Sequence, residues 1–310
     1  MNRKSFLQKS FLSSSLLLVP GLAHNTFAAS AGKTSMKLAI REKDQKNICA
    51  TCGTRYAKAR TEADACPICQ DERQYVGDKG QVWLSYQEVA KDRSIRITQL
   101  QPALYDLKVT PSFAIDQKAH LVLSKSGNIL WDCIPFLDEQ TVTYVRSLGG
   151  IKAIAISHPH YYSLMAAWAE AFDCPIYLHA QDKQWIQDKS KYIRLWEGEK
   201  MELWDDIKIV HVAGHFAGST VLHLPHHGAK GSLLTGDSIF VVRDRKHVSF
   251  MYSYPNLIPL KKPAIELIQQ RIEPLPFDAI YGAFEGQVIP TGAKEAFSRS
   301  VERYLRIYEV

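Results

Sequence analysis

The 310-residue sequence has no internal repeat, no low-complexity tract and no long block of basic residues. Without a repeat, the chain is not a solenoid or a similar array. Without a basic block, nucleic acid is not expected as a partner. What the chain does have is 46% apolar residues, enough for a full α/β core and a small accessory unit.

The chain also lacks an apolar run that is long enough to span a bilayer, which takes about 20 residues. Its N-terminal apolar run, 11–23, follows three basic residues and precedes small residues that fit cleavage after Ala28 or Ala31. We therefore predict an export signal over residues 1–31, a periplasmic location and no stable membrane insertion after processing. The basic segment resembles a twin-arginine signal, although Lys4 stands where the second arginine belongs, so the Sec route stays open. An uncleaved N-terminal anchor is the alternative.

An excess of charge of one sign is also missing from the predicted mature protein. Removing the signal leaves 35 basic and 32 acidic side chains, so the formal net charge falls from +6 to +3. A nearly neutral protein has little long-range attraction for a polyanion. We therefore expect a small-molecule substrate.

Cysteine is uncommon, and the six in the chain fall into two sets. Cys133 and Cys174 occur singly in apolar, strand-like surroundings, and we expect them to be buried thiols that act as small hydrophobic side chains. The other four form two CxxC pairs separated by 13 residues, at Cys49, Cys52, Cys66 and Cys69.

Each CxxC pair presents two sulfurs from one tight turn, and two such pairs are able to close a tetrahedral metal site. Gly53 lets the backbone bend around the metal, and we expect Tyr56 and Tyr75 to pack against this small unit. Residues 45–76 resemble the rubredoxin-like and zinc-ribbon knuckles, which implies Zn²⁺ first and Fe second. Two disulfides are the alternative, because the predicted compartment is oxidising. Either arrangement makes the cysteines structural.

The remaining sequence, 103–310, alternates short apolar runs with amphipathic stretches, which is typical of a layered α/β domain. A hairpin is predicted from the strands 119–123 and 128–133, and a buried strand over 151–156. The predicted helices are 141–148, 164–172, 182–188, 264–272 and 293–307, with further strands at 175–179 and 279–281 and a β-rich region over 201–253.

Side chains suited to metal binding follow three of the predicted strands. His158 and His160 lie two residues apart after strand 151–156, so both imidazoles are expected on the same side. His215 lies in a glycine-flanked loop, and Asp237 follows an apolar strand. Polar chemistry at the carboxyl end of a buried strand is typical of α/β folds.

In their order and spacing, the segments His158-Pro159-His160, Gly214-His215-Phe216-Ala217-Gly218 and Thr235-Gly236-Asp237 resemble the metallo-β-lactamase superfamily. The resemblance covers roughly residues 110–310 and includes Asp132 at a strand end. It implies an αββα sandwich, which is preceded here by the metal-bound knuckle. The ligands of that family come from an HxHxDH motif, a GHxxG loop, a TGD aspartate and a late histidine.

Three ligands of the family's second metal are missing. Tyr162 and Ser163 stand where HxHxDH has its aspartate and second histidine, and residues 282–286 contain no histidine where the late one is expected. A mononuclear site of three histidines remains, with Asp237 as a fourth ligand or as a carboxylate behind the ligands. Three imidazoles suit Zn²⁺, and Fe²⁺ or Mn²⁺ is the alternative.

Neighbouring side chains have a functional and a structural interpretation. Tyr161 and Tyr162 either donate hydrogen bonds to a carbonyl oxygen at the metal or pack as aromatic side chains at the strand end. We predict catalytic roles for Tyr162 and for Asp237, which would orient or transfer a proton.

Three further features also leave two interpretations open. Glu285 either approaches the metal or is solvated. His179 either lines the site or is a hydrogen-bonded core residue. The aromatic-rich segment 249–255 either lines a pocket beside the metal or packs as an ordinary strand.

We predict a metal-dependent hydrolase in which a metal-bound hydroxide attacks an ester, thioester, lactone or amide carbonyl. This reaction class rests partly on the resemblance, because fold alone does not fix chemistry. One alternative is a redox protein with an iron–thiolate knuckle, as in flavodiiron proteins, although their carboxylate-rich ligands and flavodoxin domain are missing here. The other alternative is a non-catalytic binding protein that keeps the fold, which the lost ligands support.

Overall fold

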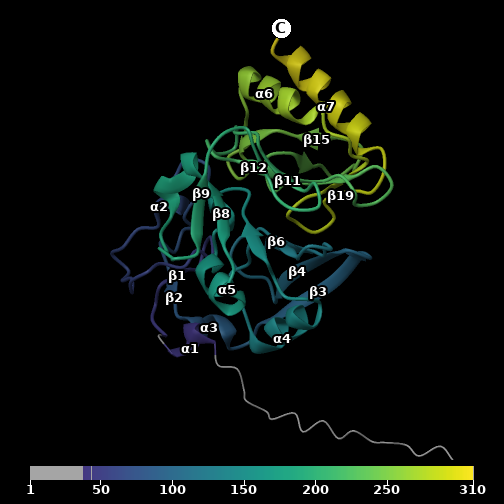
Figure 1. Cartoon of the computed structure of the whole chain (residues 1–310). Coiled ribbons are helices and arrows are strands. Elements are labelled where there is room, and N and C mark those ends of the chain that lie inside the picture. Colours follow the sequence, from purple (N-terminus) through teal and green to yellow (C-terminus); the bar gives the residue numbers. More distant parts are fainter. Residues whose placement is uncertain (1–37, 43, 310) are drawn as a thin grey trace, which may run out of the picture. The chain divides into compact units, whose positions relative to one another are not determined.

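The computed structural model describes residues 38–42 and 44–309 (Figure 1). The predicted export signal, 1–31, lies outside these residues. Across the described part of the chain, no helix combines the length and the apolarity that a membrane crossing requires.

The first β-sheet has seven strands in the order β3-β4-β5-β6-β7-β8-β9. Neighbours from β3 to β6 are antiparallel, whereas neighbours from β6 to β9 are parallel. The predicted hairpin is confirmed as β5 and β6, and β3 precedes the predicted domain start at residue 103. The strands are β3 (Ser94–Gln101), β4 (Leu104–Thr110), β5 (Lys118–Val122), β6 (Ile129–Trp131), β7 (Ala153–Ala155), β8 (Ile176–His179) and β9 (Ile193–Trp196).

The second β-sheet has six strands in the order β10-β11-β12-β13-β18-β19, in which only β13 and β18 are parallel neighbours. Two short hairpins, β14-β15 and β16-β17, lie in the connection between those two strands. The strands of the sheet are β10 (Lys200–Glu202), β11 (Lys208–His211), β12 (Thr220–Leu224), β13 (Ser232–Leu234), β18 (Ala279–Tyr281) and β19 (Val288–Ile289). The hairpins are β14 (Phe240–Val241), β15 (Val248–Ser249), β16 (Met251–Ser253) and β17 (Ile258–Pro259).

The two sheets pack face to face, and each has helices on its outer face. Side chains alternate along the buried strands, so Leu130 and Ile154 face the helices while Trp131 and Ala155 face the other sheet. Figure 1 shows α6 and α7 beside the second sheet and α4 and α5 beside the first. The predicted αββα layers are therefore confirmed. The helices are α4 (Glu139–Ser147), α5 (Met165–Phe172), α6 (Lys262–Ile272) and α7 (Ala293–Ile307).

One predicted helix is wrong. Residues 182–188 were expected to form an α-helix, but the structure has a 3₁₀ helix, η2 (Ala180–Trp185), followed by extended backbone at Ile186. The side chain of Asp182 is buried and accepts a hydrogen bond from the Gly218 N–H at 2.8 Å. This long-range contact fixes the tight turn in a way that local helix propensity does not indicate.

The N-terminal unit is built on two short antiparallel strands, β1 (Ile48–Cys49) and β2 (Trp83–Leu84). The cysteines, Tyr56, Ile68 and Trp83 form its own hydrophobic cluster, which therefore extends past the predicted boundary at residue 76. The Tyr86 hydroxyl donates to the Leu137 carbonyl at 2.5 Å, which links the following segment to the sandwich. The helices of this region are α1 (Ala39–Glu42), α2 (Pro67–Gln70) and α3 (Tyr86–Ala90).

Candidate metal centres

The four predicted ligands of the histidine site meet at one end of the sandwich, although they come from both sheets. His158 and His160 follow β7 of the first sheet, around the 3₁₀ turn η1 (Pro159–Tyr161). His215 lies in the loop between β11 and β12, and Asp237 follows β13, so both belong to the second sheet.

Backbone contacts at Ser157 hold these strand ends together. The Ser157 carbonyl accepts from the Thr220 N–H at 2.9 Å, which connects the two sheets, and its N–H donates to Asp132 Oδ1 at 2.7 Å. Gly236 has φ +51°, and a Cβ there would lie 2.4 Å from Ser157 Oγ. The glycine before Asp237 therefore lets the second sheet approach the first.

The donor atoms of the histidine site converge on one point. One ligand atom from each of the four residues lies within 4.8 Å of all the others, and all four residues are buried. Asp237 Oδ2 is 3.4 Å from His158 Nε2 and 3.8 Å from His215 Nε2. His215 Nε2 is 3.4 Å from His160 Nδ1.

In His158 and His215, Nδ1 is hydrogen-bonded, so the lone pair of Nε2 is directed toward Asp237. His215 Nδ1 is 3.1 Å from the Met251 carbonyl, which only accepts, so Nδ1 carries the hydrogen and Nε2 is unprotonated. His158 Nδ1 lies 2.9 Å from Ser157 Oγ, while its buried Nε2 has no hydrogen-bond partner among the described residues. Unpaired nitrogens facing a buried carboxylate fit a metal cation.

The electrostatics favour the protonation states that bind metal. Burial lowers the pKa of His215 to about 3 and that of His160 well below its usual value, so both imidazoles are neutral at pH 7. Burial alone would raise the pKa of Asp237, but the facing His158 and His215 imidazoles and the Tyr161 hydroxyl lower it below its usual value. Neutral imidazoles and an ionised carboxylate are the forms that coordinate Zn²⁺.

The two adjacent tyrosines have different partners. The Tyr161 hydroxyl donates to Asp237 Oδ1 at 2.5 Å. The hydroxyl of Tyr162, for which the sequence analysis predicted a catalytic role, donates instead to the backbone carbonyl of Asp182 at 3.4 Å. The structure therefore brings Tyr161 into contact with the predicted ligand set and turns the Tyr162 hydroxyl toward η2.

The positions of the missing second-metal ligands have other contacts. Ser163 Oγ accepts from Gln117 Nε2 at 2.8 Å.

Glu285 forms an ion pair with Arg96 at 2.8 Å, and its side chain is 61% exposed, which agrees with the solvated interpretation. His179 stacks on His211 with 4.0 Å between ring centroids, as expected of a packed residue.

The four knuckle cysteines also converge on one point. All are buried and none forms a disulfide. Cys49 Sγ lies 3.6 Å from Cys69 Sγ, and Cys52 Sγ lies 3.8 Å from Cys66 Sγ. A tetrahedron with metal–sulfur bonds of about 2.3 Å has edges of about 3.8 Å, so these separations fit a metal ion.

Polar groups surround these sulfurs. The Tyr56 hydroxyl donates to Cys66 Sγ at 3.0 Å, and Gln81 Nε2 donates to Cys49 Sγ at 3.2 Å. Tyr56 therefore packs in the knuckle as predicted, whereas Tyr75 is 59% exposed.

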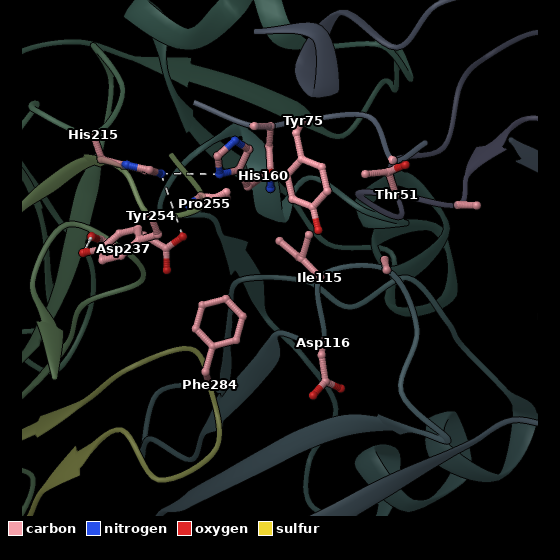
Figure 2. Close-up of a pocket in the computed structure, with 14 residues that line it drawn as sticks. Thr51, Tyr75, Ile115, Asp116, His160, His215, Asp237, Tyr254, Pro255 and Phe284 are labelled. Carbon is pink, nitrogen blue, oxygen red and sulfur yellow. Dashed lines mark hydrogen bonds and ion pairs between the residues drawn. The ribbon is translucent and has the colours of Figure 1, made fainter. Parts of the chain in front are cut away.

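A pocket of about 530 Å³ opens onto the histidine site (Figure 2). His160, His215 and Asp237 form its metal-binding side, and Phe284 lies in the loop where the family's late histidine was expected. Tyr254 and Pro255 also line it, which supports the pocket interpretation of segment 249–255. The remaining wall includes residues of the knuckle, which the sequence analysis did not predict.

Arg73 connects the two centres and was also missed. Its Nε donates to the His215 carbonyl at 2.7 Å, its Nη1 forms an ion pair with Asp71 at 2.6 Å, and its guanidinium lies 4.5 Å from the ring centroid of Phe216. No motif surrounds Arg73, and a contact between residues 142 positions apart leaves no local signal. Only the folded structure reveals it.

The chain resembles known proteins in sequence and in structure. It is 44% identical over 262 residues to the "Uncharacterized protein YmaE" of Bacillus subtilis (strain 168), covering 84% of this chain and 95% of the relative. It is similar to the solved DIM-1 metallo-β-lactamase, with a TM-score of 0.51 and 13% identity over 69% of this chain and 100% of that chain. It is also similar to the metallo-β-lactamase FIM-1 from Pseudomonas aeruginosa in its mono-zinc form, with a TM-score of 0.50 and 15% identity over 69% and 97%. No protein-family model matches.

Proposed function

The chain belongs to the family of the Bacillus subtilis protein YmaE and has the metallo-β-lactamase fold, and from this premise we propose that it is a metal-dependent hydrolase. The observation that carries the proposal is the convergence of three buried imidazoles and one carboxylate, of which His160, His215 and Asp237 line a pocket. Burying nitrogen and oxygen atoms without a partner costs free energy unless they bind a cation. The pocket gives a substrate access to them.

We propose Zn²⁺ for both centres, held by His158, His160, His215 and Asp237 in one and by the four cysteines in the other, with Fe as the alternative in either. When bound at the histidine site, Zn²⁺ supplies Lewis-acid polarisation of a carbonyl oxygen and lowers the pKa of water toward about 7. The solved mono-zinc form of FIM-1 supports a single ion in this fold.

The side chains of this chain have separate roles in the proposed hydrolysis of an ester, thioester or lactone. Tyr161 holds Asp237 Oδ1, so that Oδ2 stays directed at the histidines. As one of the four groups that would hold the ion, the ionised Asp237 carboxylate would orient the attacking water. Phe284 and Tyr254 line the pocket beside the site, where a bound substrate that packs against them would exclude bulk water and strengthen these interactions.

Elemental analysis of the purified mature protein tests the proposal. We expect two zinc ions in the wild type, loss of one in His158→Ala, and loss of the other in Cys49→Ser. Wild-type protein should hydrolyse p-nitrophenyl esters or lactones, and His158→Ala should lose this activity. A metal content that does not respond to His158→Ala would contradict the proposed centre, and iron in the knuckle would favour the redox alternative.

We also propose that the protein acts after export to the periplasm, because of the basic and apolar pattern in residues 1–31. The intact mass of the protein recovered from its native compartment should correspond to a chain that begins after Ala28 or Ala31. An unprocessed mass would contradict cleavage.

A further inference from the structure

The knuckle and the histidine site share one pocket. Ala50 and Thr51 lie between the first two cysteines, and Gln74 and Tyr75 follow the last; all four line the pocket that contains the histidine ligands. A closed four-sulfur site has no coordination position left for a substrate. The contribution of the knuckle to the reaction is therefore the shape of the pocket wall.

Several hydrogen bonds connect this wall to the β16–β17 hairpin and to the His215 loop of the sandwich. Ser253 Oγ donates to the Arg73 carbonyl at 3.0 Å, and Asn256 Nδ2 donates to the Glu72 carbonyl at 2.9 Å. The Arg73 side chain donates in turn to the His215 carbonyl. The residue that follows, Gln74, is buried. The backbone that carries Tyr75 therefore has a defined position relative to the histidine site.

Tyr75 is an exposed aromatic side chain in the pocket that also contains the buried metal ligands. It is 59% exposed, and its hydroxyl has no hydrogen-bond partner among the described residues. In the view of Figure 2, its ring projects into the pocket between His160 and Ile115, with Phe284 on the facing side. Aromatic side chains bury large areas on contact, so this ring offers an apolar surface next to the metal ligands.

The charges of the pocket restrict what it accepts. Among the described residues that line it, none is lysine or arginine, and the two carboxylates are Asp237 and Asp116. Asp116 is already paired with Lys108 at 2.8 Å. A negative group on the substrate, away from the metal, would lose water without gaining a cationic partner, and that is unfavourable.

We infer that Tyr75 is a specificity-determining residue, and that the knuckle wall selects neutral carbonyl substrates with an apolar acyl chain of several carbons. This inference rests on the proposed hydrolase function and names its substrate class. The chain of the substrate lies against Tyr75, Ile115 and Phe284 while its carbonyl group faces His160, His215 and Asp237.

Calorimetric binding to the mature, zinc-loaded protein tests the inference without any hydrolysis. The probes are hexanamide, acetamide, and adipamate, which carries a carboxylate at the end of the same six-carbon chain. Hexanamide should bind at least tenfold more tightly than either of the others. Tyr75→Ala should weaken hexanamide binding by about tenfold and leave acetamide unchanged, whereas Tyr75→Phe should bind as the wild type does, because no described residue pairs with the hydroxyl.

Tyr144→Ala is the matched control, since Tyr144 is a 42% exposed tyrosine on α4, away from the pocket. The same variants are then assayed with p-nitrophenyl hexanoate and acetate, where Tyr75→Ala should raise KM for the hexanoate only. The inference is overturned if hexanamide and acetamide bind alike, if adipamate binds as well as hexanamide, or if Tyr75→Ala changes nothing. Tyr75-dependent binding of hexanamide without hydrolysis of esters or lactones would support the apolar binding surface at Tyr75 and contradict the proposed hydrolase.

Discussion

Tyr161 and Tyr162 are neighbours in the sequence, yet their hydroxyls reach different parts of the molecule. The backbone after β7 enters a 3₁₀ turn at Pro159, and this turn directs Tyr161 toward Asp237 and Tyr162 toward the Asp182 carbonyl. Strand alternation predicted that His158 and His160 share a side, and both do reach the site, although His160 already lies inside the turn. It does not apply inside the turn, so the sequence pattern was unable to decide between the two tyrosines.

This difference leads to a prediction for Tyr161→Phe. The substitution removes the hydrogen bond that orients Asp237, and loss of a group that positions a metal ligand typically weakens metal binding by about 10- to 100-fold. We expect zinc affinity at the histidine site to fall by about tenfold, as measured by competition with a chelator of known affinity.

The control is Tyr162→Phe, which removes the 3.4 Å bond to the Asp182 carbonyl and leaves Asp237 untouched. Its zinc affinity should stay within about twofold of the wild type, because it removes no contact with a ligand. Equal losses in both variants would contradict the assignment of Tyr161 as the positioning residue.

Individual helices and strands show which parts of the fold the sequence was able to predict. The strand 279–281 and the helix 293–307 were predicted with the bounds that the structure has, because continuous apolar runs and a 3.6-residue period are local signals. The helix expected over 182–188 failed because Asp182 caps the Gly218 N–H, a contact between distant segments. The pocket wall made by the knuckle was missed for the same reason.

The knuckle offers a second prediction, at the scale of the element. Cys66→Ser removes a sulfur that lies 3.8 Å from Cys52 Sγ and accepts from Tyr56. We expect loss of the knuckle metal with retention of the metal at the histidine site. Because the wall that carries Tyr75 depends on the knuckle, KM for p-nitrophenyl hexanoate should rise by about tenfold.

Cys174→Ser provides the comparison for this variant. Cys174 is a buried cysteine that packs in the core of the first sheet, outside both ligand sets. Elemental analysis should find both metals in it, and its KM should match the wild type. A Cys66→Ser protein that keeps two metals would show that the four sulfurs do not form a metal site.

The whole molecule combines parts whose apolar clusters differ in size. The sandwich contains three clusters of buried apolar side chains, whereas the knuckle has one small cluster in which four of the members are cysteines. Units this small rarely bury enough apolar surface to stay folded without a metal or another cross-link. Removal of metal is therefore expected to unfold the knuckle while the sandwich stays folded.

Treatment with a zinc chelator followed by limited proteolysis checks this expectation. The first cuts should fall within residues 45–84, while the sandwich from about residue 94 onward stays intact, as mass spectrometry of the fragments would show. His158→Ala protein with its knuckle metal in place should resist these cuts. Cleavage that begins in the sandwich instead would show that the histidine site, not the knuckle, is the weaker unit.

The two ligand sets also differ in when they become available during synthesis. The cysteines leave the ribosome within one short segment, from Cys49 to Cys69, and are able to take up metal while most of the chain is still unmade. The histidine site needs His158 from one sheet and Asp237 from the other, so it exists only after both halves of the sandwich have formed. Loading of the histidine site would thus require both halves of the sandwich to have formed, whereas loading of the knuckle would not.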